Sequence, residues 1–401
     1  MKRLQIFIMS LVFTISMGWF YSASGNVLSP TAPLFTGMGT HHHAITTKST
    51  PAKRYFDQGL VLAYGFNHAE AARSFRQAIK LDPNCAMCNW GLAYVLGPNI
   101  NATMEDDAVP ESYAAIQQAV KLSENSSEAE QAYISALSQR YTDKALEDRS
   151  ALDLAYAKAM AQVTREHPDD LDAATIYAEA LMNTMPWDYW TEEGEPKPEA
   201  QKVLDTLESI LEGEPNHPGA NHLYIHAVEA VKPEQAISAA DRLGDLVPGS
   251  GHLVHMPSHI YIRVGRYHDA AVANQKAIAV DKDYAAQCHA QGIYPLAYMP
   301  HNHHFLWFSA IMEGDSKLAT EAGKNVAEMV DPDMMREPGM GTLQHFSIIP
   351  LFTMIRFGQW DEILATPQPD ADLKYPTGVW HYARGLAFAA QGKITEAKQE
   401  L

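Results

Sequence analysis

The sequence predicts an all-α protein in which antiparallel helix pairs stack into an α-solenoid. Three observations support this fold class. From residue 51 onward the chain is rich in Ala, Leu, Glu and Gln at helical spacing. It has few runs of alternating β-branched residues, which strands would need. Small and aromatic residues also return with a period of about 34 residues, which is the length of one stacked helix pair.

Composition excludes several classes of protein. Of the 401 residues, 46% are apolar, so the chain can bury a substantial core. Lys and Arg number 30 against 48 for Asp and Glu, and the formal charge of −18 repels phosphate backbones and anionic lipids. We therefore expect no nucleic-acid partner. Three cysteines are too few for a disulfide-built scaffold, whereas 18 histidines are unusually many.

The N-terminus has the three-part form of a secretory signal. Lys2 and Arg3 precede an apolar run over residues 4–21, and small residues follow at 22–25. We expect residues 1–25 to be a signal peptide and the protein to be exported, periplasmic or secreted, with no membrane association after cleavage; an uncleaved anchor is the alternative. Residues 26–50 are rich in Ser, Thr, Pro and Gly, which predicts a flexible tether.

The first predicted helix pair spans residues 51–83. Gly59 and Ala71 let two helices approach closely, Phe75 fills the gap between them, and Pro83 ends the second helix. With Ala78, these residues occupy the expected slots of the tetratricopeptide repeat, and the chain resembles that superfamily. The resemblance implies a concave groove, lined by the first helix of each pair, that binds a protein or peptide partner.

The same frame returns downstream. Further units begin at or near His217, Gly251, Pro300, Gln344 and Gly378. The last unit runs out at the end of the sequence without a polar capping helix, so we expect the solenoid, residues 51–401, to be truncated at its C-terminus. Pro and aromatic residues interrupt the frame and predict insertions near 186–198 and 285–300.

Longer stretches resemble uncharacterised secreted bacterial tetratricopeptide proteins. They include GTHHH at 39–43, YFDQGLVLAYGFNHAEAARSF at 55–75, CAMCNWG at 85–91 and HMPSHIYIRVGRYHDA at 255–270. This resemblance covers nearly the whole mature chain. It implies the fold and export, and it implies no established activity, catalytic residue or cofactor.

Histidines gather on the face of the first helices that should line the groove. Residues three and four apart share one face of a helix, and the repeat frame places most of these histidines there. The predicted metal ligands are His222, His226, Glu229, His255, His259 and His304. Glu229 is expected either as a ligand or as the outer acceptor that fixes an imidazole tautomer. The predicted groove or partner-binding residues are His252, His301, His303 and His345.

Paired imidazoles one turn apart suit a transition metal. Zn or Cu takes three or four imidazole or carboxylate ligands. The main hypothesis is an exported scaffold that binds a partner in its groove and has a histidine-rich centre able to hold Zn or Cu. One alternative is a plain interaction scaffold without metal. The other is a metal-dependent enzyme that uses Glu229 as base or ligand, although HExxH, GxSxG and phosphate-loop motifs are absent from the sequence.

Cys85 and Cys88 lie just after Pro83, where a new helix should begin. In an exported protein this spacing favours a local disulfide, distant from the histidine groove. A two-thiolate metal half-site and a redox pair remain as alternatives.

Overall fold

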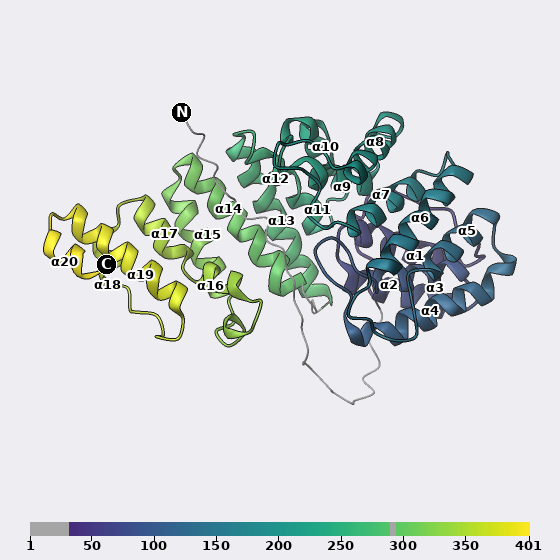
Figure 1. Ribbon diagram of the computed structural model, residues 1–401, viewed down its shortest axis with the longest axis horizontal. Coiled ribbons are helices and arrows are strands. Elements are labelled where there is room, and N and C mark those ends of the chain that lie inside the picture. Colours follow the sequence, from purple (N-terminus) through teal and green to yellow (C-terminus); the bar gives the residue numbers. More distant parts are fainter. Residues whose placement is uncertain (1–31, 289–293) are drawn as a thin grey trace.

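The computed structural model describes residues 32–288 and 294–401, and the predicted signal peptide lies outside these ranges. Within them the chain forms helices that follow one another along an elongated array (Figure 1), without a strand beyond two isolated bridges. The predicted all-α class is therefore confirmed. No helix of the described ranges is long and apolar enough to cross a membrane.

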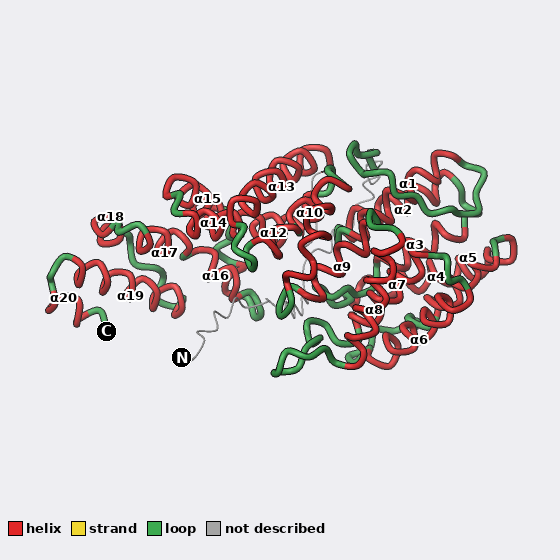
Figure 2. Tube along the Cα trace, turned by 90° about the horizontal axis from the view of Figure 1, so that it is seen from above, coloured by secondary structure: helices red, strands yellow, loops and turns green. Residues whose placement is uncertain are grey.

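Twenty α-helices and five short helices make up the array, and Figure 2 shows the loops that join them. The α-helices are α1 (Thr50–Tyr64), α2 (His68–Leu81), α3 (Ala86–Val95), α4 (Val109–Leu122), α5 (Glu128–Ser138), α6 (Ser150–Glu166), α7 (Leu171–Asn183), α8 (Pro198–Gly213), α9 (Pro218–Val228), α10 (Ile237–Leu246), α11 (Gly251–His255), α12 (Pro257–Tyr261), α13 (Tyr267–Cys288), α14 (Met299–Glu313), α15 (Ser316–Glu328), α16 (Gly341–Ser347), α17 (Ile349–Arg356), α18 (Trp360–Ala365), α19 (Lys374–Ala390) and α20 (Ile394–Gln399). The short helices are η1 (Asp106–Ala108), η2 (Ser123–Asn125), η3 (Pro233–Ala236), the π-helix η4 (Tyr294–Tyr298) and η5 (Met334–Arg336).

Close helix packing in the first repeat follows from its small residues. Phe75 is fully buried between helices α1 and α3. A Cβ atom added at Gly59 would lie 2.7 Å from the Phe75 ring, and one added at Gly91 would also overlap this ring. The glycines therefore make room for the phenyl ring that fills the centre of the repeat.

Helix α1 also packs against α9, far along the sequence. Gly219 makes this approach close, because a Cβ atom there would lie 2.7 Å from the Tyr64 ring. The end of α1 is thereby brought to the helix that carries His222 and His226.

Residues 32–49, here called the strap, lie against the helices. The Gly249 amide donates to the Gly37 carbonyl at 2.8 Å, and the Thr46 amide donates to Glu130 at 2.6 Å. Ala32 and Ile45 are buried. The expected tether is thus an extended, packed segment in this part of the chain. Its polar side chains have partners that only the tertiary structure supplies.

The predicted insertions and the cysteine pair differ in local structure. Helix α7 ends at Asn183 and α8 begins at Pro198, so the segment between them is non-helical. Of the second expected insertion, residues 289–293 lie outside the described ranges, whereas 285–288 belong to helix α13 and 294–300 to η4 and α14. Cys85 is the N-cap of α3 and forms a disulfide with Cys88.

Candidate metal centre

Two groups of three histidines lie side by side in the middle of the array. Each histidine offers one ring nitrogen, and the three nitrogens of a group lie within 4.8 Å of one another. The groups are adjacent, since the ring centroids of His226 and His259 are 5.7 Å apart. Triad A comprises His222, His226 and His252, and triad B comprises His255, His259 and His301.

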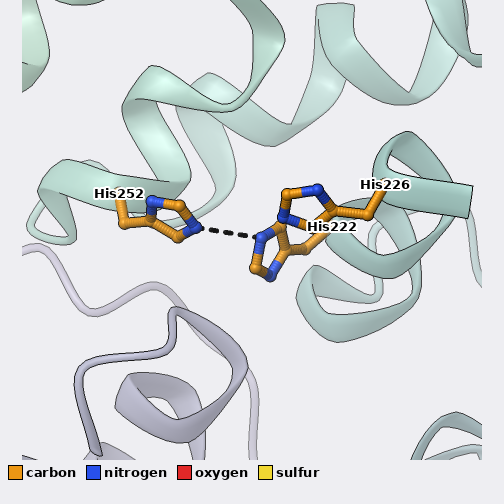
Figure 3. A group of neighbouring side chains, drawn as sticks. All are labelled: His222, His226 and His252. Carbon is orange, nitrogen blue, oxygen red and sulfur yellow. Dashed lines mark hydrogen bonds between the residues drawn. The ribbon is translucent and has the colours of Figure 1, made fainter. Parts of the chain in front are cut away.

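Triad A is built from two helices (Figure 3). His222 and His226 are one turn apart on α9 and face His252 from α11. The Nε2 atoms of His222 and His252 are 3.1 Å apart. Within the described residues, Nε2 of His226 is buried and has no hydrogen-bond partner.

The hydrogen bonds of α9 set the tautomers of its histidines. His222 Nδ1–H donates to the Tyr64 carbonyl oxygen at 2.6 Å, and His226 Nδ1–H donates to Glu229 Oε1 at 2.9 Å. Because a neutral imidazole carries one N–H, the Nε2 atom of each ring holds a lone pair. The lone pair of His226 Nε2 has no partner within the described residues, and that of His222 Nε2 faces His252 Nε2 at 3.1 Å. A cation placed between these rings could be coordinated by both.

Triad B shows the same arrangement. His255 Nδ1–H donates to Asn274 Oδ1 at 2.6 Å, and the Asn274 amide is oriented by its own bond to the Ala270 carbonyl. His259 Nδ1–H donates to Glu229 Oε2 at 2.7 Å. The Nε2 atoms of His255 and His259 are 2.9 Å apart, and His301 Nε2 is 3.4 Å from His259 Nε2. Two lone pairs therefore face each other within hydrogen-bond distance, which is unfavourable without a cation between them.

Glu229 lies behind both triads. Its two oxygens accept the Nδ1–H groups of His226 and His259, which is the geometry expected of an acceptor that fixes the imidazole tautomers. Burial would raise the pKa of Glu229, but the two histidines hold it well below the ordinary value. The carboxylate is therefore ionised and orients one imidazole of each triad, as outer carboxylates do in metal sites.

Burial favours the neutral form of five of the triad histidines. It lowers the pKa of His222, His252, His255 and His301 well below the ordinary value of 6.5, and neighbouring imidazoles lower these values further. Burial also lowers the pKa of His226, although Glu229 opposes the shift. Neutral imidazole is the form that coordinates metals.

Aromatic rings pack against the histidines of both triads. Phe66 and Trp187, the non-glycine residues with positive φ in the described ranges, have φ values of 54° and 62°. Their ring centroids lie 5.8 and 5.2 Å from that of His226. Phe305 packs against the three rings of triad B at 4.5 to 4.8 Å. Backbone strain beside a buried polar group is a common feature of functional sites.

The structure redistributes the predicted histidines. His252 and His301, predicted to contact a partner, belong to the triads. His304, predicted as a ligand, instead stacks on Trp307 at 5.4 Å and contacts His345 at 5.5 Å. His304 follows His301 by three residues on α14, about 60° short of a full turn. The His304 side chain therefore points towards α16. His303 lines a separate cavity of about 260 Å³, and His345 bonds to the Tyr375 hydroxyl.

The buried imidazoles should make the metal-free protein less stable in mild acid. Below pH 6.5 the unfolded chain takes up protons that the folded triads do not, so the free energy of unfolding should fall as pH decreases. The loss is at most about 1.4 kcal/mol per triad histidine for each pH unit. His43, whose pKa is raised, opposes this trend as a single group. Urea unfolding in chelator at pH 7.5 and 5.5 measures the effect, and an unchanged midpoint would contradict it.

The fold and this site define an α-solenoid with a buried six-histidine centre. Neither the comparison with protein families nor that with curated proteins gives a match. Solved structures with similar folds include the human IFIT1 dimer with PPP-AAAA (14% identity, 87% of this chain and 71% of that chain, TM-score 0.43). They also include a tetratricopeptide repeat protein from Parabacteroides merdae (14%, 62% and 84%, 0.35) and a STAND protein with a tetratricopeptide repeat sensor from Pyrococcus horikoshii (12%, 88% and 52%, 0.45). The likeness is one of fold alone.

Proposed function

We propose that this helical-repeat scaffold binds two transition-metal ions, one in each histidine triad. The observation that carries the proposal is the 2.9 Å approach of the His255 and His259 Nε2 atoms while both Nδ1 atoms donate elsewhere. A shared proton would relieve the repulsion only by creating a buried imidazolium. Burial lowers the pKa of His255, so it disfavours a second proton on that ring. A metal ion uses both lone pairs and keeps the imidazoles neutral.

The spacing of the nitrogens suits one ion per triad. A tetrahedral zinc ion with Zn–N bonds of 2.0–2.1 Å places its ligand nitrogens about 3.3 Å apart. The Nε2 separations of 3.1 Å in triad A and of 2.9 and 3.4 Å in triad B are close to this value. All-imidazole ligand sets favour Zn or Cu over Mg or Ca.

Three protein ligands leave one coordination position of a tetrahedral ion open. Catalytic zinc sites share this property, whereas structural sites are closed. His301 is only partly buried, so triad B is the triad with a side chain near solvent. A metal-dependent enzyme is therefore the second candidate function, and it depends on the same ions.

The scaffold role and export remain part of the proposal. A concave solenoid surface suits a protein or peptide partner. The Cys85–Cys88 disulfide supports an oxidising compartment, periplasmic or extracellular.

Metal analysis of the mature, tag-free protein tests the proposal. Stripped protein titrated with Zn²⁺ or Cu²⁺ should take up two tightly bound ions per chain, and X-ray absorption should show a first shell dominated by imidazole nitrogen. Metal uptake without imidazole ligation, or no tight binding of either ion, would contradict metal binding in the triads. The remaining function would then be that of an interaction scaffold without metal.

A further inference from the structure

A second set of metal-ligating side chains lies outside the triads, where the strap crosses the N-terminal ends of α7 and α9. A cavity of about 810 Å³ opens there, and its wall includes His41, His43, Asp170, Asp172 and His217. In an extended segment, alternate residues face the same side. Accordingly His41 and His43 face Asp172, whereas His42 bonds to Asp57.

Asp172 is the centre of this cluster. Its Oδ1 accepts from His41 Nε2 at 3.0 Å, from His217 Nε2 at 3.2 Å and from the Tyr64 hydroxyl. Its Oδ2 accepts from His43 Nδ1 at 2.8 Å. Burial would raise the pKa of Asp172, but the bonds from His217, His41 and His43 hold it well below the ordinary value. The carboxylate is therefore ionised.

Two groups of potential ligands share Asp172, and hydrogen bonding distinguishes them. One group consists of His41, Asp172 and His217. His217 Nδ1 accepts the Ala220 amide at 3.2 Å as the N-cap of α9, so its proton is on Nε2. With Nδ1 as acceptor and Nε2 as donor, His217 has no lone pair for a metal. This group is a hydrogen-bond network that orients Asp172.

The other group consists of His43, Asp170 and Asp172, with one donor atom of each within 4.8 Å of the others. Asp170 Oδ1 accepts from the Tyr133 hydroxyl and from the Ala173 amide as the N-cap of α7. Its Oδ2 has no such bond within the described residues. His43 bonds only through Nδ1 and the backbone, so its proton can move to Nε2 when Nδ1 binds a cation. All three side chains can therefore ligate without breaking a helix cap.

We propose that His43, Asp170 and Asp172 form a divalent-cation site that fastens the strap to α7. This site goes beyond the proposed function of the triads. Its ligands are one imidazole and two carboxylates, and the adjoining cavity has room for water molecules that complete the coordination shell. Such an oxygen-rich set accepts Mn²⁺, whereas the all-imidazole triads favour Zn or Cu. Mn²⁺ is therefore a selective probe.

The test is an electron paramagnetic resonance titration of the full chain with Mn²⁺. We expect one site per chain and slower proteolysis of the strap when Mn²⁺ is bound. Asp170→Asn keeps the α7 cap but removes the charge, and His43→Phe keeps an aromatic ring against Tyr133. Each should weaken Mn²⁺ binding at least about tenfold, because each removes a ligand.

Two further variants separate this site from the rest of the molecule. Asp82→Asn makes the same chemical change at a strap contact, the Thr47 hydroxyl, that involves none of the three ligands, and it should leave Mn²⁺ affinity unchanged. His226→Ala combined with His255→Ala disables both triads and should also retain the Mn²⁺ site. Absence of Mn²⁺ binding to the full chain, or equal affinities for Asp170→Asn and Asp82→Asn, would overturn the inference. Neither result would bear on Zn or Cu in the triads.

Discussion

Replacing His255 with alanine should remove one of the two tightly bound Zn²⁺ or Cu²⁺ ions. His255 supplies an Nε2 lone pair to triad B, and His259 and His301 alone leave two protein ligands. We expect the affinity of that site to fall by more than about a hundredfold, since changes to outer-shell partners alone cost 10–100-fold. Calorimetric titration of the stripped protein measures the number of sites and each affinity.

Two alanine variants serve as controls for this experiment. His226→Ala should remove the ion of triad A and retain that of triad B. His304→Ala truncates an imidazole on α14 that packs on Trp307, so it should retain both ions. If His255→Ala binds two ions with the affinities of the wild type, triad B is not a metal site.

Glu229→Gln should weaken the binding of both metal ions. The carboxylate accepts one Nδ1–H from each triad, from His226 and from His259. A glutamine amide has one acceptor oxygen, and its NH₂ group would face the other imidazole N–H. That imidazole must change tautomer, which places its proton on Nε2 and removes the metal-binding lone pair. The substitution also removes the negative charge between two cations, and we expect a loss of 10–100-fold in affinity.

The matched control for this variant is Glu208→Gln. Glu208 also accepts a bond from α9, from the Tyr224 hydroxyl at 2.8 Å, but it contacts neither triad. Circular dichroism and thermal unfolding of the metal-free forms show whether each variant is folded. Unchanged Zn²⁺ affinities for a folded Glu229→Gln would show that the carboxylate does not set the imidazole tautomers.

Much of the fold follows from local sequence. Helical spacing of apolar residues predicts the helices, and the pairing of Gly59 with Phe75 predicts the close packing of the first repeat. The candidate site is predicted where it depends on spacing within one helix or one turn, as for His222 with His226. These features depend on contacts between residues near in sequence, so periodicity reveals them.

Membership of the histidine centre was decided by tertiary structure. His252 and His301 belong to the triads and His304 does not, because the rotation of each helix depends on packing against helices far from it in sequence. The carbonyl of Tyr64 places the His222 proton on Nδ1, and this carbonyl reaches α9 only because α1 packs there. Likewise, the strap is held by Asp172 and Glu130, far along the chain. Local periodicity is enough to predict the helices and the one-turn histidine pairs, whereas long-range packing sets which nitrogens meet and which of them carry a lone pair.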